Sequence, residues 1–251
     1  MRALVFLFLL IFSSSFAQNA EELFGNANTL YKEGSYVKAI KIYEDLIKED
    51  LVSSELYFNL GNCYYKTNKV GPAIFNYEKA LQLNPLNKDA ENNLVFAKRL
   101  SLDRIEELPK TFLQKFNQNY ISKLSYETWA WLCILLSFTA ALLFIAYYFS
   151  ANSGKKRLFF STSIISFLCL LVFIAITFHQ YNKERTKKEA IVYATEVSVK
   201  NEPTKNAEEA FSIHEGTKLL VLDGVDDWSK IQLLDGKIGW LKTNQINLLQ
   251  E

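Results

Sequence analysis

The sequence has few of the residues on which most catalytic and metal sites depend. Its 251 residues include two histidines and three cysteines, and it contains no GxSxG, P-loop, HExxH or glycine-rich dinucleotide motif. His179 and His214 belong to different regions, and Cys63 has no histidine near it. We therefore expect no enzymatic activity, no metal site and no other cofactor. A redox enzyme that uses Cys63 is the weaker alternative, because a lone thiol on a helix is usually inert.

A disulfide framework and a strong net charge are lacking as well. Cys133 and Cys169 lie inside long apolar runs, and no CxxC pair occurs. Lys and Arg number 28 and Asp and Glu number 27, and both polar parts of the chain are mildly acidic. Since a protein that binds a phosphate backbone needs a basic surface, we expect no nucleic-acid partner.

What the sequence does have is two long apolar runs. Residues 128–150 and 158–181 contain no Asp, Glu, Lys or Arg, and each is long enough for the ~20 apolar residues of a membrane-spanning helix. Residues 151–157 between them are too few for a domain, so we predict a membrane hairpin. A hairpin returns the chain to the side from which it came. The alternative is two core helices of a soluble protein, but such helices are typically shorter.

Residues 1–17 have the pattern of a secretory signal peptide. Arg2 precedes an apolar core, and Ser15 and Ala17 supply the small residues of a cleavage site before Gln18. Cleavage there would make Gln18 the first residue of an exported domain. An uncleaved membrane anchor is the alternative.

The charges around the hairpin do not agree on its orientation. Lys155, Lys156 and Arg157 favour a cytoplasmic loop by the positive-inside rule, whereas a raw count of the cations beyond the two runs favours the reverse. The signal peptide decides between the two orientations, because it directs the first domain to export before the hairpin forms. We therefore expect residues 18–127 and 182–251 to share the periplasm and the loop that carries Lys155, Lys156 and Arg157 to be cytoplasmic.

An internal repeat fills the first polar segment. Residues 20–53 and 54–87 align along their whole length. The second copy has small, aromatic and helix-ending residues at Leu60, Gly61, Tyr64, Ala73, Tyr77, Ala80 and Pro85. The first copy shares the pattern at Ala27, Gly34, Tyr36, Ala39 and Tyr43 and departs from it at Asn26, Leu30, Leu46 and Leu51. With a period of about 34 residues, the copies resemble tetratricopeptide repeats, which are stacked helix pairs. Residues 88–106 are expected to form a capping helix within a domain over 18–107.

The resemblance implies a groove lined by the first helix of each pair. In this register the groove consists of Phe24, Asn28, Tyr31 and Lys32 in the first copy and Phe58, Asn62, Tyr65 and Lys66 in the second. An amide can bond a peptide backbone and a lysine can meet a carboxylate, so protein partners are expected. The alternative is that the amides and lysines are only solvated and the aromatic residues only pack. Under either reading, Asn62 and Lys66 lie outside the core.

The last segment, residues 190–251, changes to the alternating pattern of β-strands. Asp235-Gly236 between apolar runs is typical of a hairpin turn. The segment resembles bacterial SH3-like domains, which implies a small β-barrel. We expect Trp228, beside Asp226 and Asp227, to be its surface aromatic and Trp240 to lie in the barrel core.

Two connections complete the chain. Residues 108–127 carry aromatic and basic residues in the pattern of an amphipathic helix at a membrane surface, with a plain linker as the alternative. Residues 182–189 form a short linker. The expected fold class is a multidomain membrane protein with all-α tetratricopeptide repeats, two transmembrane helices and an SH3-like small β-barrel.

The order of these segments is similar to that of the BatE family encoded in Bacteroides-type aerotolerance operons. The resemblance implies an inner-membrane protein that works with von Willebrand-type membrane proteins and a MoxR-type ATPase in stress tolerance. The leading hypothesis is a non-enzymatic scaffold that binds protein partners and is held in membrane lipid. The alternative is an envelope anchor whose SH3-like domain binds cell-wall peptide.

Overall fold

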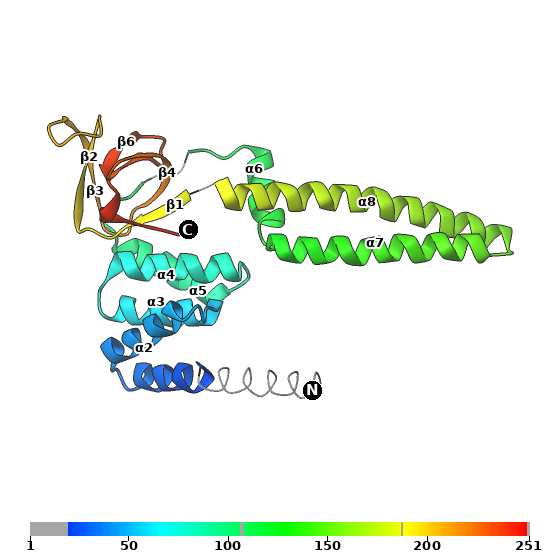
Figure 1. Ribbon diagram of the computed structural model, residues 1–251, viewed down its shortest axis with the longest axis horizontal. Coiled ribbons are helices and arrows are strands. Elements are labelled where there is room, and N and C mark those ends of the chain that lie inside the picture. The colour runs from blue at the N-terminus through cyan, green and yellow to red at the C-terminus, as the bar shows by residue number, and fades with distance from the viewer. Residues whose placement is uncertain (1–19, 106–107, 187, 250–251) are drawn as a thin grey trace, which may run out of the picture. The chain divides into compact units, whose positions relative to one another are not determined.

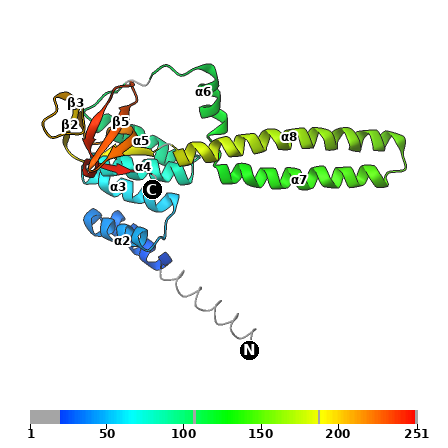
Figure 2. The same cartoon turned by 45° about the horizontal axis from the view of Figure 1, so that its top comes forward.

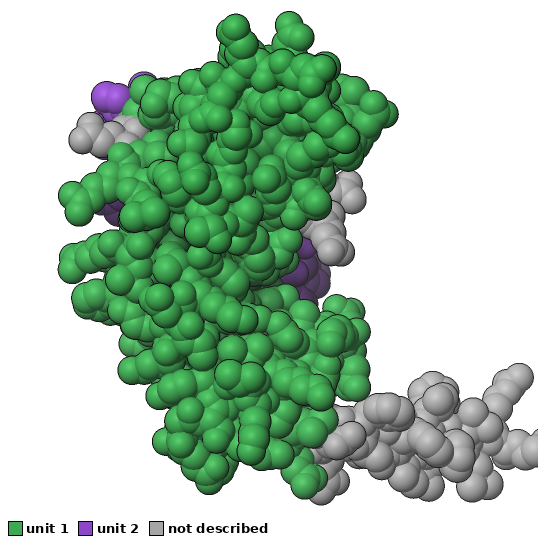
Figure 3. Space-filling model, turned by 90° about the vertical axis from the view of Figure 1, so that its left-hand side faces the viewer, with its two compact units in different colours: residues 1–108, 188–251 green, residues 109–187 purple. Residues whose placement is uncertain are grey.

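A computed structural model describes residues 20–105, 108–186 and 188–249 of the chain (Figure 1). The expected signal peptide, residues 1–17, lies outside these residues. The chain divides into two compact units. Residues 1–108 and 188–251 form one unit, and residues 109–187 form the other (Figure 3). Two parts that are far apart in sequence therefore fold together, and the apolar segment between them is a unit of its own.

The first half of the larger unit is an array of antiparallel helices. A helix over residues 20–32 is followed by α2 (Tyr36–Lys48), α3 (Ser54–Lys66), α4 (Val70–Leu83) and α5 (Lys88–Leu100). Ser53 and Asn87 cap α3 and α5 by accepting hydrogen bonds from backbone N–H groups in the first turn. Pro72 occupies the first turn of α4, and Pro85 follows its end. The two sequence copies are thus helix pairs, as predicted.

Small residues let the paired helices approach closely, and two tyrosines fill the space between them. Ala27, Ala39 and Ala73 are fully buried, and Tyr43 and Tyr77 are at most 1% exposed. A Cβ atom on Gly61 would lie 2.8 Å from the ring of Tyr77, which is closer than ordinary van der Waals contact. Gly61 is therefore required by packing, because any side chain there would displace the ring.

Helix α5 has the place of the first helix of a third repeat. It follows α3 at the same spacing of about 34 residues by which α3 follows the helix over residues 20–32. No second helix completes this third repeat, because residues 101–105 run on without regular structure. The helix ends at Leu100, before the expected boundary at residue 106. Beyond Leu100 the chain leaves the helical array, because the Asp103 carboxylate accepts a hydrogen bond from the His214 backbone N–H in the C-terminal part of the unit.

The second half of the larger unit is an antiparallel sheet of seven strands, which we call the β-domain (residues 188–249). Its strands are β1 (Lys188–Val192), β2 (Glu196–Lys200), β3 (Glu209–His214), β4 (Lys218–Val225), β5 (Trp228–Leu233), β6 (Ile238–Lys242) and β7 (Ile246–Leu248), in the order β3-β2-β6-β5-β4-β1-β7. Alternate side chains such as Val197, Val199 and Ile231 form its core. Gly236, with φ of 95°, turns the chain between β5 and β6, as the Asp235-Gly236 pair predicted.

The smaller unit contains two long apolar helices that pack side by side (Figures 1 and 2). Helix α7 (Tyr126–Phe149) and residues Ser153–Lys183 of α8 (Ser153–Thr186) are long enough to cross a membrane, and each contains an 18-residue window with a mean hydropathy of 2.2 in α7 and 2.6 in α8. Ser163 donates a hydrogen bond from one helix to the Ala140 carbonyl of the other, over 3.1 Å. They form the antiparallel pair expected of a hairpin.

The connection between the two apolar helices is shorter than expected. The Asn152 side chain accepts hydrogen bonds from the backbone N–H groups of Gly154 and Lys155. This cap starts α8 at Ser153, so the basic residues expected in a loop over 151–157 lie in the first turns of the helix.

Candidate functional site

The predicted groove residues lie on the first helices of the repeats, as their register requires. Phe24, Asn28, Tyr31 and Lys32 belong to the helix over residues 20–32, and Phe58, Asn62, Tyr65 and Lys66 belong to α3. Both lysines are exposed, whereas the aromatic and amide residues are half-buried. We call this surface, with its continuation on α5, the first-helix face.

The two asparagines are hydrogen-bonded inside the array, which corrects the expectation that they are free polar positions. The Asn62 Oδ1 atom accepts from the Tyr77 hydroxyl and from Asn93 Nδ2, both over 2.7 Å. Asn28 Oδ1 accepts in the same way from Tyr43 over 2.6 Å and from Asn59 over 2.9 Å. Each asparagine therefore joins three successive helices. This role explains why the amide recurs in both copies without reference to any partner.

The aromatic residues of the face also take part in packing. The Phe24 ring meets the Tyr43 ring edge-on at 5.9 Å, and the Phe58 ring lies 6.1 Å from that of Tyr77. Their half-buried rings contact the core on one side and remain accessible on the other. Such rings can contribute apolar contact to a bound chain at little cost in side-chain entropy.

Helix α5 extends the face by a third tier that was missing from the predicted groove. Phe96 and Arg99 stand at the repeat positions of Asn62 and Tyr65. The Phe96 side chain is 51% exposed, and the Arg99 guanidinium lies 5.4 Å from its ring centroid. The repeat period itself could have found them, because α5 keeps the register of the two copies although its residues differ.

Charges repeat along both margins of the first-helix face. The C-terminal margin carries the exposed cations Lys32, Lys66 and Arg99, and the N-terminal margin carries the exposed acids Glu21, Glu55 and Asp89. This polarity complements the helix dipoles, which favour acids at the N-terminus and cations at the C-terminus. It also presents any partner lying across the helices with one acidic and one basic edge.

Opposite the open end of the array, the β-domain covers α4 and α5. Ile191 and Leu249 join the apolar cluster of Ile74, Leu94 and Ala97 and are fully buried there. The β-domain thus packs on α4 and α5 at the end of the array, where the third repeat lacks a second helix. It buries the helix surface that a stacked repeat array needs to cover at its end.

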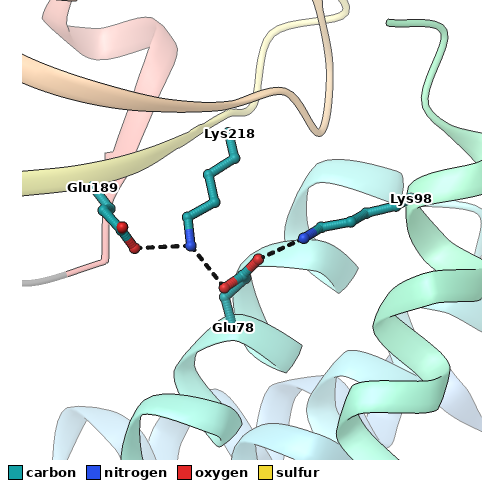
Figure 4. Close-up of polar contacts among 4 residues, drawn as sticks. All are labelled: Glu78, Lys98, Glu189 and Lys218. Carbon is teal, nitrogen blue, oxygen red and sulfur yellow. Dashed lines mark hydrogen bonds and ion pairs between the residues drawn. The ribbon is translucent and has the colours of Figure 1, made fainter. Parts of the chain in front are cut away.

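A partly buried ion-pair network, with Lys98 at its exposed edge, joins the two halves of this interface (Figure 4). Lys218 of β4 contacts Glu78 of α4 at 2.9 Å and Glu189 of β1 at 2.8 Å, and Lys98 of α5 contacts Glu78 at 2.9 Å. Burial opposes the ionisation of Glu78, but the charges of Lys218 and Lys98 outweigh it and lower its pKa to about 2. Burial likewise opposes the charge of Lys218, and the two glutamates still raise its pKa.

A second polar cluster fastens the chain after α5 to the β-domain. The Asp103 carboxylate accepts hydrogen bonds from the His214 backbone N–H over 2.6 Å and from the Thr217 hydroxyl over 2.5 Å. It also lies 2.8 Å from the Nδ1 atom of His214. Burial opposes the ionisation of Asp103, but the hydrogen bonds from Thr217 and His214 outweigh it and lower its pKa.

Two glycines permit the close contact between α4 and the β-domain. A Cβ atom on Gly71 would lie 2.8 Å from the carbonyl oxygen of Val192, and one on Gly216 would lie 2.8 Å from Ile74 Cδ1. The Gly71 N–H also donates to Glu215 Oε1 over 2.9 Å. The backbones of α4 and the β-domain therefore meet directly at Gly71, and at Gly216 the backbone of the β-domain lies against side chains of α4.

The expected surface aromatic of the β-domain is buried. Trp228 is 7% exposed, and the Lys242 ammonium lies 4.4 Å from its ring centroid. That lysine is held by an ion pair with Asp227, so the lysine stem covers the indole. Asp226 and Asp227 are exposed, as expected, whereas Trp240 is half-buried rather than enclosed in the core. The prediction for Trp228 was wrong because Asp226 and Asp227 indicate that the turn is exposed, and this exposure does not extend to the tryptophan that follows.

Cys63 is unsuited to nucleophilic chemistry. It is 0% exposed, and burial raises the pKa of its thiol to about 12. At neutral pH such a thiol is protonated, and the thiolate is the reactive form. Over the described ranges, no group of three or more His, Cys, Asp or Glu residues is placed to hold a metal ion.

Comparison with known proteins agrees with the helical part of this description. The model of the tetratricopeptide repeat family matches residues 54–87. No curated protein matches the chain. The match covers the second sequence copy, α3 and α4, and the preceding helix pair has the same architecture. The helical array is thus built of tetratricopeptide-like repeats, a family whose repeats generally serve protein–protein interaction.

Proposed function

We propose that the protein is a membrane-anchored scaffold that binds a protein partner on its first-helix face. The observation that carries this proposal is the asymmetry of the array. The β-domain covers its end, while aromatic and basic residues of three successive first helices stay accessible on one side. A surface that needed only solvation would not require exposed rings such as Phe96, which is 51% exposed.

The chemistry of the face indicates what the partner presents. Phe24, Phe58 and Phe96 offer apolar contact near its middle, and the cation row of Lys32, Lys66 and Arg99 favours carboxylates along one edge. The amides of Asn28 and Asn62 have their oxygens engaged within the array. We therefore assign recognition to the rings and cations and not to the asparagine oxygens. An extended or helical segment with acidic residues along one side fits this arrangement.

The hairpin supplies the membrane anchor in this proposal. Two spans return the chain to one side, so the repeats and the β-domain share a compartment. The expected signal peptide makes this compartment the periplasm and the membrane the bacterial inner membrane. The segment order favours a BatE-like protein, with von Willebrand-type membrane proteins and a MoxR-type ATPase as associated components in stress tolerance.

A second function, anchoring to the cell wall, rests on the β-domain. If this domain is SH3-like, the half-buried Trp240 and the exposed turn at Asp226 and Asp227 offer a site for cell-wall peptide. This function is tested by measuring the binding of the protein to purified cell wall. The full-length protein is used because the array and the β-domain share one folded unit. This second function would be favoured if the parent protein is retained on the purified cell wall and the conservative Asp226→Asn variant is not.

The scaffold is tested by site-specific photo-crosslinking in intact cells. A photoreactive residue at Lys66 lies on the first-helix face, and one at exposed Lys41 of α2 is the matched control on the second-helix side. We expect a discrete protein adduct from position 66 and none from position 41. The same adducts from both positions, or none from either, would contradict binding on this face.

A further inference from the structure

The segment before the first apolar helix carries an exposed apolar face. Helix α6 (Phe112–Phe116) and the π-helical turn η1 (Asn117–Ile121) expose Phe112 by 81%, Leu113 by 76%, Phe116 by 47% and Tyr120 by 66%. At helical spacing these four side chains share one face, and the polar residues Gln114, Lys115 and Gln118 lie on the other. A run this apolar and this exposed needs a partner surface.

Hydrogen bonds fix this segment to both apolar helices. The carbonyl oxygen of Ile121 accepts from Trp129 Nε1 of α7 over 3.1 Å and from Gln180 Nε2 of α8 over 3.0 Å. Lys183 of α8 donates to the Ser122 hydroxyl over 3.2 Å. The segment is therefore held at the end of the hairpin where α7 begins and α8 finishes.

That end of the hairpin has the composition of a membrane boundary. The Tyr126 and Tyr181 rings lie 5.8 Å apart, and Trp129 packs edge-on against Phe173 at 5.1 Å. Tyrosine and tryptophan favour the headgroup level, where one side of the ring is apolar and the other meets water. A segment bonded to Trp129 is set at the same depth.

The orientation of α6 agrees with a position at the membrane boundary. Figures 1 and 2 both show α6 running across the end of the hairpin, transverse to α7 and α8. If α7 and α8 cross the membrane, a transverse helix at their end lies in the membrane plane. The stretch over residues 109–126 also contains Lys110, Lys115 and Lys123 but no acidic residue. Basic amphipathic segments of this kind bind at lipid headgroups.

We propose that α6 and η1 form a lateral membrane anchor, with the face of Phe112, Leu113, Phe116 and Tyr120 inserted among the lipids. The inference rests on the membrane hairpin of the proposed function but not on the partner of the first-helix face. The anchor sets the point at which the chain leaves the lipid. Because it is bonded to both spanning helices, it also resists their rotation and vertical movement.

The test is the quenching of a fluorescent label by lipids with brominated acyl chains. The full-length protein, with Cys133 and Cys169 replaced by alanine and the fully buried Cys63 retained, is reconstituted in vesicles of phosphatidylcholine and phosphatidylglycerol. A bimane label is attached at Leu113→Cys, at Gln118→Cys on the polar face, or at Phe138→Cys within α7. We expect brominated lipid to cause loss of fluorescence at positions 113 and 138 and none at 118.

Each other outcome overturns the proposal in a distinguishable way. Quenching at 138 without quenching at 113 leaves the hairpin intact and removes the lateral anchor. Equal quenching at 113 and 118 excludes a lipid-facing side. If the fluorescence at position 113 changes with the protein-to-lipid ratio but not with bromination of the lipid, the apolar face of α6 and η1 contacts a second copy of the protein and not lipid. Absence of quenching at 138 contradicts the membrane hairpin itself, and the lateral anchor fails with it.

Discussion

At the scale of single residues, Gly25 and Gly61 both lie in first helices but have different surroundings. A Cβ atom on Gly61 would lie 2.8 Å from the Tyr77 ring, whereas one on Gly25 would have no neighbour within 4 Å. We expect Gly61→Ala to reduce the free energy of unfolding by ~1–3 kcal/mol through overpacking. Gly25→Ala should raise it by ~0.5–1 kcal/mol, because alanine favours the helix. Chemical denaturation of the detergent-solubilised protein measures both, and equal effects would contradict the close helix contact.

Asn62 and Lys66 occupy one face but differ in their bonding. Asn62→Ala removes the acceptor of hydrogen bonds from Tyr77 and Asn93, and we expect it to cost ~1–3 kcal/mol of folding stability. Lys66 is exposed, so Lys66→Ala should change stability by no more than about 0.5 kcal/mol. Thermal melting distinguishes the two variants. If the Asn62→Ala variant melts at the same temperature as the parent protein, the hydrogen bonds of this asparagine do not stabilise the packing of the helices.

The ionisation of Glu78 makes the interface sensitive to acid. Its pKa is about 2 in the folded protein against an ordinary value of 4.5, so the unfolded chain binds the proton more readily. The stabilisation is complete above about pH 4.5 and is lost as the pH falls towards about 2. It amounts to at most roughly 3 kcal/mol.

The matched variant for this pH dependence is Glu78→Gln, which cannot titrate. We expect the parent to lose stability more steeply than the variant between about pH 4.5 and about pH 2, as measured by urea unfolding at a series of pH values. Asp103 titrates in both proteins, so the difference between the two curves reports on Glu78. Parallel curves would show that Glu78 does not hold a depressed pKa.

At the scale of secondary-structure elements, the contact between α4 and the β-domain depends on Gly71. Its Cβ would meet the Val192 carbonyl at 2.8 Å, and backbone atoms cannot move aside as a side chain does. We expect Gly71→Ala to loosen the contact and to accelerate amide hydrogen exchange in α4 and β1 together. In the control Gly224→Ala the Cβ would lie 3.7 Å from the Trp228 carbonyl, an ordinary contact. Unchanged exchange in Gly71→Ala would contradict direct packing of these elements.

The sequence predicted the elements better than their mutual contacts. Helix pairs, long apolar helices and the Asp235-Gly236 turn all follow from local periodicity and turn chemistry. The pairing of Lys218 with Glu78 spans 140 positions, and no local pattern marks it. The hydrogen bonds of Asn28 and Asn62 between helices were missed for a related reason. A polar residue that recurs in every repeat has the same pattern whether it meets a partner or joins helices.

At the scale of the whole molecule, the central claim is that the hairpin brings two separate parts of the chain together on one side of a membrane. Residues 20–105 and 188–249 fold into one unit although the apolar helices lie between them in sequence. Such a unit can form only if both parts reach the same compartment. We propose that this compartment lies outside the cytoplasm, a proposal that rests on the signal peptide expected from the sequence.

Cysteine labelling in intact cells tests this claim most directly. Single cysteines are placed at exposed Glu33, Ser153 and Thr204, in protein with Cys133 and Cys169 replaced and the buried Cys63 retained. A membrane-impermeant maleimide should label positions 33 and 204 in intact cells and position 153 only after permeabilisation. Labelling that separates position 33 from position 204, or that reaches position 153 in intact cells, would contradict the account.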